Sequence, residues 1–163
     1  MILKLCNNGK SVIGTREDGA MVSYSIEAEE YKQWLSEGNI PEPEFSEEEL
    51  LVQAKASKLA EVTATYNTSI TALVGNTDQY ELTSWTKQEA EARAYVASNK
   101  AITPLLSGMI VARGLGETVL QFANLIIANA DAYRNAYATI LGTYQANQKA
   151  ISKATTVAEV QAI

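Results

Sequence analysis

The side chains best suited to chemistry lie close together in one predicted helix. Glu89, Glu91 and Arg93 follow one another at two-residue spacing in an alanine-rich segment. Two carboxylates beside a guanidinium are a combination that can serve as a general acid and base. Glu89 and Arg93 are also four residues apart, the spacing of an ion pair on a solvated helix face. We favour the ion-pair interpretation.

The other groups that catalysis commonly uses are missing. The 163 residues include no histidine, which removes the commonest general base, histidine-containing triads and histidine metal sites. Cys6 is the single cysteine; its apolar, strand-like surroundings favour buried packing over a reactive thiol. Neither a phosphate-binding loop nor a dinucleotide-binding glycine motif occurs. We predict a protein that is not an enzyme and has no catalytic residue, cofactor or metal.

The charge of the chain is concentrated in one segment. Nine glutamates and one lysine lie between residues 27 and 49, which gives that segment a net charge of −8 (one minus nine), against −6 for the whole chain. The remainder lacks a basic patch, so nucleic-acid binding is not expected. No apolar run approaches the roughly 20 residues that span a bilayer, and the N-terminus lacks a signal-peptide core, so we expect a soluble protein that is not classically secreted. The acidic segment is either a solvated linker and helix face or a docking strip for a basic partner.

The N-terminal residues predict a small β module. Turn signals at Asn7-Asn8-Gly9 and Glu17-Asp18-Gly19 separate three short strands within residues 2–26. A helix over 27–37 follows, with Trp34 on its apolar face, and covers the strands. Residues 39–45, which contain two prolines between acids, form an extended linker.

The remaining residues predict helices. A capping box, Ser46-x-x-Glu49, opens a helix that runs to Val74. A polar loop over 76–85 follows, and the capping box Thr86-x-x-Glu89 starts a helix over 87–98. Further helices are expected from Thr103-Pro104 to Arg113-Gly114 and over 117–153. A third capping box, Thr156-x-x-Glu159, starts a final turn or two over 157–163. The 117–153 helix would be about 55 Å long and needs partners along its apolar stripe.

The predicted fold class is therefore mainly α: a helical bundle with one or two long helices, preceded by a small N-terminal β-hairpin or β-meander. The domains are 1–38 for the β module with its helix, 39–45 for the linker, and 46–163 for the helices. Seven residues of the 46–74 helix form a heptad seam, which suits either an ordinary packed helix or an intermolecular coiled coil. They are Val52, Ala56, Leu59, Thr63, Tyr66, Ile70 and Leu73.

Large aromatic side chains are the candidates for recognition. Trp85 precedes a predicted helix start, where a bulky ring either fixes the start of the helix or contacts a partner. Tyr133, Tyr137 and Tyr144 form a stripe on the long helix among asparagines and glutamines, a composition that suits either a core or a hydrated protein interface. The candidate partner-binding residues are Trp85, Tyr133, Tyr137, Tyr144 and Trp34.

Several motifs in order resemble one family. They are Trp85-Thr-Lys-Gln-Glu-Ala-Glu-Ala-Arg-Ala-Tyr95, Thr103-Pro-Leu-Leu106, Ala112-Arg-Gly114, Ile127-Ala-Asn-Ala-Asp-Ala-Tyr133 and Thr155-Thr-Val-Ala-Glu-Val-Gln-Ala-Ile163. Together with Lys55 to Ala60, they resemble the DUF4376 domain of tailed-bacteriophage and prophage proteins over about residues 50–163. The stretch from Tyr31 to Pro43 also resembles the lead-in of small phage tail proteins. That family often has an arginine after the glycine of the long helix. This chain has Gly142-Thr-Tyr144 at that place.

The resemblance implies a role beside tail fibres and carries no catalytic residue. One role is an assembly factor, or chaperone, that binds the fibre in the bacterial host cytoplasm. The other is a minor tail or baseplate component that stays in the virion tail. A self-assembling coiled-coil spacer of the virion is the alternative, and homo-oligomers are compatible with each role.

Overall fold

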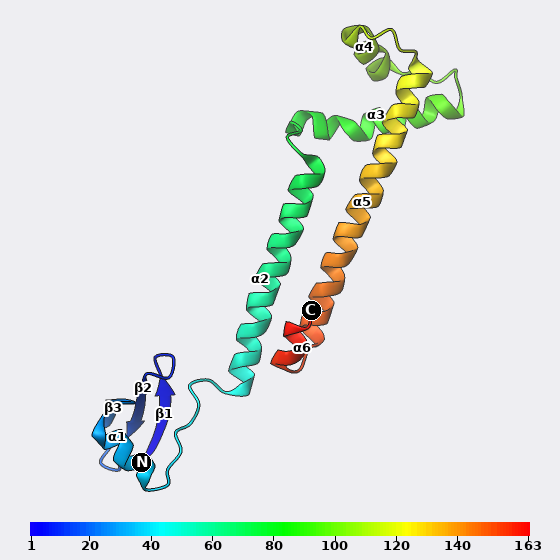
Figure 1. The fold of residues 1–163 in the computed structure, drawn as a ribbon. Helices are drawn as coiled ribbons and strands as arrows, with labels where there is room; N and C mark the ends of the chain where they lie inside the picture. The colour runs from blue at the N-terminus through cyan, green and yellow to red at the C-terminus, as the bar shows by residue number, and fades with distance from the viewer. The chain divides into compact units, whose positions relative to one another are not determined.

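The computed structural model describes residues 1–163 and is mainly α, with 64% of the residues in helices (Figure 1). Three strands precede six helices, which confirms the predicted class. The strands are β1 (Ile2–Cys6), β2 (Ser11–Thr15) and β3 (Met21–Ser25). The helices are α1 (Glu29–Ser36), α2 (Glu47–Val74), α3 (Gln79–Ala97), α4 (Pro104–Arg113), α5 (Val119–Lys153) and α6 (Val157–Gln161).

The chain forms two compact units. Unit 1 comprises residues 1–56 and 154–162, and unit 2 comprises residues 57–153 with 163. The division therefore falls within α2, whereas we predicted a boundary in the linker before that helix. It also assigns α6 to the unit that holds the sheet.

Unit 1 is built on an antiparallel sheet in the order β1-β2-β3. The turn between β1 and β2 uses Asn7 and Asn8 at positive φ, which asparagine tolerates better than most residues. Leu3 and Val12 are fully buried under α1, whose Tyr31 and Trp34 rings stack with centroids 6.0 Å apart. The helix thus covers one face of the sheet, as three short strands require.

The outer edge of β1 is occupied by the linker. Leu5 N–H donates to the Glu42 carbonyl at 2.9 Å, and Glu42 N–H donates to the Leu3 carbonyl at 2.8 Å. The bridge is parallel and is a single residue long, because Pro41 and Pro43 on either side have no N–H to donate. The linker predicted over 39–45 is therefore paired with the sheet at Glu42.

Two predicted capping boxes in unit 1 are confirmed. Ser46 Oγ accepts from Glu49 N–H at 3.1 Å, and a Glu49 carboxylate oxygen accepts from Ser46 N–H at 2.8 Å. Thr156 and Glu159 form the same reciprocal pair at the start of α6. The Ser46 N–H lowers the pKa of Glu49. The Thr155 N–H and hydroxyl, and to a lesser extent the Thr156 N–H, lower the pKa of Glu159, because its carboxylate accepts these donors in its charged form.

In unit 2, α3 begins earlier than predicted. The helix starts at Gln79 because Asp78 acts as its N-cap, accepting from Tyr80 N–H at 2.7 Å. Thr86, predicted as the cap, lies inside the helix, and Trp85 lies there too. The predicted loop is confirmed over residues 76–78 but was wrong over 79–85, because Asp78, eight residues before Thr86, caps the helix instead.

The core of unit 2 lies where α3, α4 and α5 meet. It consists of Ala92, Leu106, Phe122 and Ala123. The first turn of α4 is capped from α3: Glu91 Oε2 accepts from Leu105 N–H at 3.0 Å and from Leu106 N–H at 3.1 Å. Glu91 is thus a helix cap, and the predicted exposed ion-pair face does not include it.

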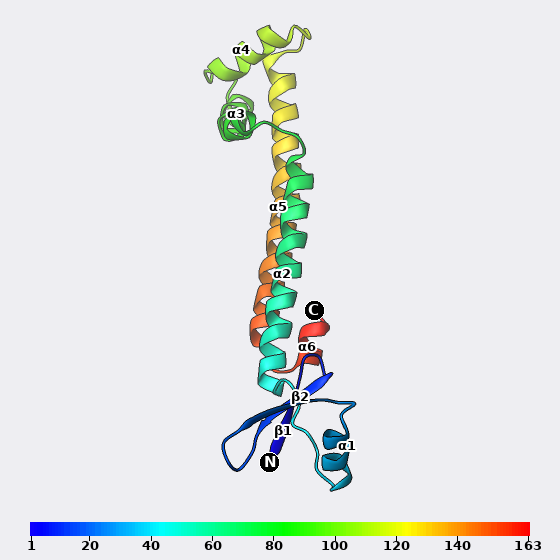
Figure 2. The same ribbon diagram turned by 90° about the vertical axis from the view of Figure 1, so that its left-hand side faces the viewer.

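The part of α2 in unit 2 runs beside α5 in both ribbon views (Figures 1 and 2). Tyr66 of α2 stacks on Tyr144 of α5 with centroids 4.5 Å apart, and Thr63 Oγ1 lies 3.4 Å from the Tyr144 hydroxyl. The heptad seam predicted for α2 is only partly covered: Val52 is 61% and Leu59 40% exposed, while Val62, outside that seam, is buried. None of the six helices combines the length and the apolar character that a bilayer span demands.

Candidate protein-binding groove

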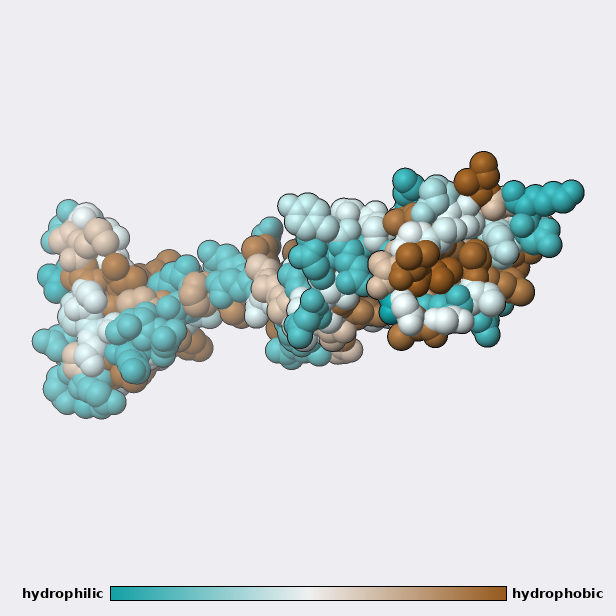
Figure 3. Space-filling view, turned by 90° about the horizontal axis from the view of Figure 1, so that it is seen from above, coloured by the Kyte–Doolittle hydropathy of each residue, from teal (hydrophilic) through white to brown (hydrophobic).

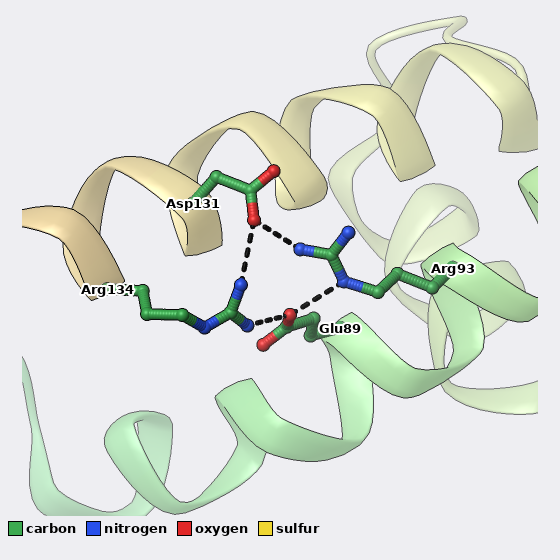
Figure 4. A network of polar contacts seen from close by, with 4 residues as sticks. All are labelled: Glu89, Arg93, Asp131 and Arg134. Carbon is green, nitrogen blue, oxygen red and sulfur yellow. Dashed lines mark hydrogen bonds and ion pairs between the residues drawn. The ribbon is translucent and has the colours of Figure 1, made fainter.

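A closed ring of four charged side chains joins α3 to α5 (Figure 4). Arg93 Nε donates to Glu89 Oε1 at 2.7 Å, and Arg134 Nη1 donates to Asp131 Oδ1 at 2.9 Å. Contacts of Arg93 with Asp131 and of Arg134 with Glu89 complete the ring. Each carboxylate therefore meets two guanidinium groups, and the ring has no net charge.

The ring keeps Glu89 ionised. Hydrogen bonds from Arg93 and then Arg134 lower the pKa of Glu89, because they stabilise its charged form. Hydrogen bonds to Glu89 and then to Asp131 raise the pKa of Arg93, because they stabilise its charged form. A carboxylate with a lowered pKa does not hold a proton near neutral pH, so Glu89 is poorly suited to act as a general acid.

Beside the ring lies a groove of about 950 Å³, walled by α3, α4, α5 and the end of α2. Its aromatic wall consists of Trp85, Tyr133 and Tyr137. Trp85 meets Tyr133 edge to face at 5.4 Å between centroids, and Tyr133 stacks on Tyr137 at 6.0 Å. Edge-to-face and offset-stacked pairs are favourable arrangements that hold the rings in place before any ligand arrives.

Most charges around the groove are already paired. Glu89 and Arg134 belong to the ring, and Arg113 Nε lies 2.7 Å from Glu117 Oε1. The Arg113 guanidinium also sits 4.5 Å from the centre of the Phe122 ring, a cation–π contact. Glu81 is the one lining charge without such a partner. A charged ligand would therefore gain little here, whereas an apolar or uncharged polar one would contact prepared rings.

The structure brings together three of the five residues proposed for recognition: Trp85, Tyr133 and Tyr137 share the groove. Tyr144 lies farther along α5 against Tyr66. Trp34 is 9% exposed and belongs to the core of unit 1. Its ring is covered by its own fold, so little of it is available to a partner.

Sequence reasoning missed several residues that contact the groove or belong to the ring beside it. Tyr66 was assigned only to a seam, yet it stacks on Tyr144, and its hydrogen bond with Tyr137 raises the Tyr66 pKa. Asp131 and Arg134 were not singled out, although their i,i+3 spacing is an available signal. No group of three or more cysteine, aspartate or glutamate side chains is placed to hold a metal ion.

Comparison with protein-family models, with curated proteins and with solved structures finds no match to this chain. The resemblance to the DUF4376 domain therefore depends on the quoted motifs alone.

Proposed function

We propose that the chain is a protein-binding module of a tailed bacteriophage, associated with the tail fibre. Two things support the proposal: the motif resemblance, and the groove of unit 2 with its three prearranged rings. The protein acts either as an assembly factor on the fibre in the host cytoplasm or as a minor component of the tail or baseplate.

The groove favours a protein segment whose contacting side chains carry no charge. Because Glu89, Arg113 and Arg134 are already paired within the chain, the bound segment contributes apolar or uncharged side chains. Aromatic rings of this kind dominate the energetics of many protein interfaces when a partner excludes water from them. The partner is therefore a fibre or baseplate segment with an apolar stripe.

A pull-down with the tail-fibre protein of the phage that encodes this chain tests the proposal. We expect the wild-type chain to retain the fibre protein and Trp85→Ala to retain at least tenfold less, since loss of a central aromatic residue costs about 2 kcal/mol or more. Tyr80→Ala is the matched control, because Tyr80 is on the same helix, is 85% exposed and does not line the groove.

Equal retention by Trp85→Ala and the wild type would remove the groove from the proposal. Failure of the wild type to bind any virion protein would remove the function itself. Mass spectrometry of purified virions then separates the two roles: absence from particles eliminates the structural one.

A further inference from the structure

Glu81 is the one charged residue lining the groove that has no ion-pair partner within the chain. Its side chain is exposed, and the Ser84 hydroxyl donates to its backbone carbonyl, at 2.7 Å, rather than to its carboxylate. The two cations that line the groove, Arg113 and Arg134, are held by other carboxylates. Glu81 therefore presents a negative charge that no cation of the groove neutralises.

Glu81 lies toward one end of the groove. It stands in the first turn of α3, close in the chain to the end of α2, whose Leu73 and Val74 also line the groove. Along α5 the lining runs from Phe122 to Tyr137, which is about 22 Å of helix. The groove is therefore long enough to hold a segment of a partner protein whose two ends lie in different surroundings.

The two ends of the groove differ in charge. At the α4 end, Phe122 lies against Arg113, and Arg113 is itself paired with Glu117. Hydrophobic surface is visible at the α4 end of unit 2 (Figure 3). Tyr137 lies toward α2, with whose Tyr66 it forms a hydrogen bond. The groove is thus neutral toward α4 and negative toward the start of α3.

Trp85 stands beside Glu81 on the same face of α3. The two residues are four positions apart, a spacing that brings Cβ atoms to about 5–6 Å, and both line the groove. A lysine or arginine side chain matches this pair, because its apolar stem can cover the indole ring while its charged end reaches the carboxylate. The segment that carries such a side chain would also shield the ion pair from part of the solvent.

A segment without a basic residue fits this end less well. A wholly apolar segment would remove water from the Glu81 carboxylate without supplying a hydrogen bond, which is unfavourable. An acidic segment would be repelled. The uncharged contacts expected elsewhere in the groove follow from the internal pairing of Glu89, Arg113 and Arg134, and Glu81 has no such pairing.

We propose that the segment bound in the groove carries one basic residue, a lysine or an arginine, at the end of its uncharged apolar stripe. The charged end of that residue pairs with Glu81 and its stem packs beside Trp85, so the pair fixes the direction in which the segment lies. This proposal rests on the proposed function of the groove and adds to it the charge and the orientation of the partner.

A pull-down with the same tail-fibre protein at two salt concentrations tests it. At about 0.1 M NaCl we expect Glu81→Gln to retain about threefold less fibre protein than the wild type, the size of effect that a partly exposed ion pair gives. At about 1 M NaCl, where the screening length is about 3 Å, the two should retain nearly equal amounts. Trp85→Ala should be defective at both concentrations, because its ring makes no ionic contact.

The matched control is Glu47→Gln. Glu47 is also exposed and also stands in the first turn of a helix, α2, but it lies outside the groove. This variant removes the same charge and should retain fibre protein as the wild type does at both salt concentrations. Helix content by circular dichroism should be unchanged in both variants. An equal loss of retention in both would assign the effect to net charge and would overturn the proposal.

A small probe tests the same site without the fibre protein. N-acetylarginine amide should shift the indole N–H signal of Trp85 in nuclear magnetic resonance spectra, a signal that the variant Trp85→Phe identifies. N-acetylcitrulline amide has nearly the same shape and no charge, so it should shift the signal less. In Glu81→Gln the two probes should give equal shifts, because the carboxylate that distinguishes them is gone.

These experiments separate this proposal from the proposed function. If Glu81→Gln retains as much fibre protein as the wild type at low salt while Trp85→Ala does not, the groove binds the fibre and the basic residue is excluded. If the wild type retains no fibre protein, the proposed function fails and the two small probes decide on the cation site. Equal shifts from both probes in the wild type overturn that site as well.

Discussion

Glu89 accepts hydrogen bonds from two arginines of different helices and is the least exposed member of its ring, at 22% of its side chain. Its partner Arg93 was predictable, because the two residues are four positions apart on one helix. The i,i+3 pair of Asp131 and Arg134 was predictable for the same reason. The contacts between the two pairs were not, since they join residues 38 and 45 positions apart. The sequence could thus predict the two ion pairs within helices but not the closed ring.

The lowered pKa of Glu89 makes the stability of unit 2 depend on pH. The folded-state pKa lies below the ordinary value of 4.5, so the stabilisation is complete above that value and is lost as pH falls through the folded pKa. Glu89→Gln lacks this contribution. Between about pH 5 and about pH 3, we expect its urea midpoint to fall less steeply than that of the wild type. Glu81→Gln is the control, and an equal slope for Glu89→Gln and the wild type would contradict the assignment.

Leu106 is fully buried in the core of unit 2, beside Ala92 and Phe122. Leu106→Ala removes buried methyl groups and leaves a cavity, which costs about 2–5 kcal/mol of unfolding free energy. Urea denaturation followed by circular dichroism measures the loss. Leu120→Ala, at a residue that is 50% exposed, should change the free energy by less than about 1 kcal/mol.

At the scale of the helix, α4 depends on a cap that comes from a different helix. Thr103 makes no capping hydrogen bond with its side chain, and Glu91 of α3 satisfies the first N–H groups instead. The sequence predicted where α4 begins, because Pro104 suits a first turn. It could not predict the cap, which depends on how α3 packs against α4.

Removal of that cap should loosen α4 locally. For Glu91→Ala we expect a loss of about 1 kcal/mol and faster hydrogen exchange at the amides of Leu105 and Leu106, since both lose their acceptor. Exchange in α6, which has its own capping box, should be unchanged. Protection of Leu105 and Leu106 equal to that of the wild type would show that another group caps the helix.

The start of α3 shows how local signals compete. Asp78 and Thr86 are both competent N-caps, and three residues after Thr86 stands Glu89, the usual partner in a capping box. The structure uses Asp78, and Glu89 pairs with arginines. The polar composition of residues 76–85 therefore indicated a loop where a helix forms.

For the molecule as a whole, the two units hold separate cores, around Leu3 and Val12 in one and around Leu106 and Phe122 in the other. We expect two thermal transitions by calorimetry. Leu3→Ala should lower one transition temperature and Leu106→Ala the other, each by several degrees. A single transition shifted equally by both variants would show that the units unfold together.

The class of the fold and the order of its elements were predictable, because helical periodicity and capping boxes are local properties of the sequence. The sequence could not predict that the chain divides at Ala56 or that residues 154–162 belong to unit 1. Both depend on contacts between residues that are distant in the sequence.

The bridge at Glu42 limits how the sheet can grow. A sheet with two free edges can polymerise by adding copies at both sides, which is the route to fibrils. Here Glu42 is the single residue paired with β1, and the prolines on either side of it cannot extend the hydrogen-bonded pairing. The edge formed by β3 is therefore the one that remains open. Edge-to-edge pairing through β3 would therefore stop at two molecules, because the folded sheet has no second open edge from which a fibril could grow.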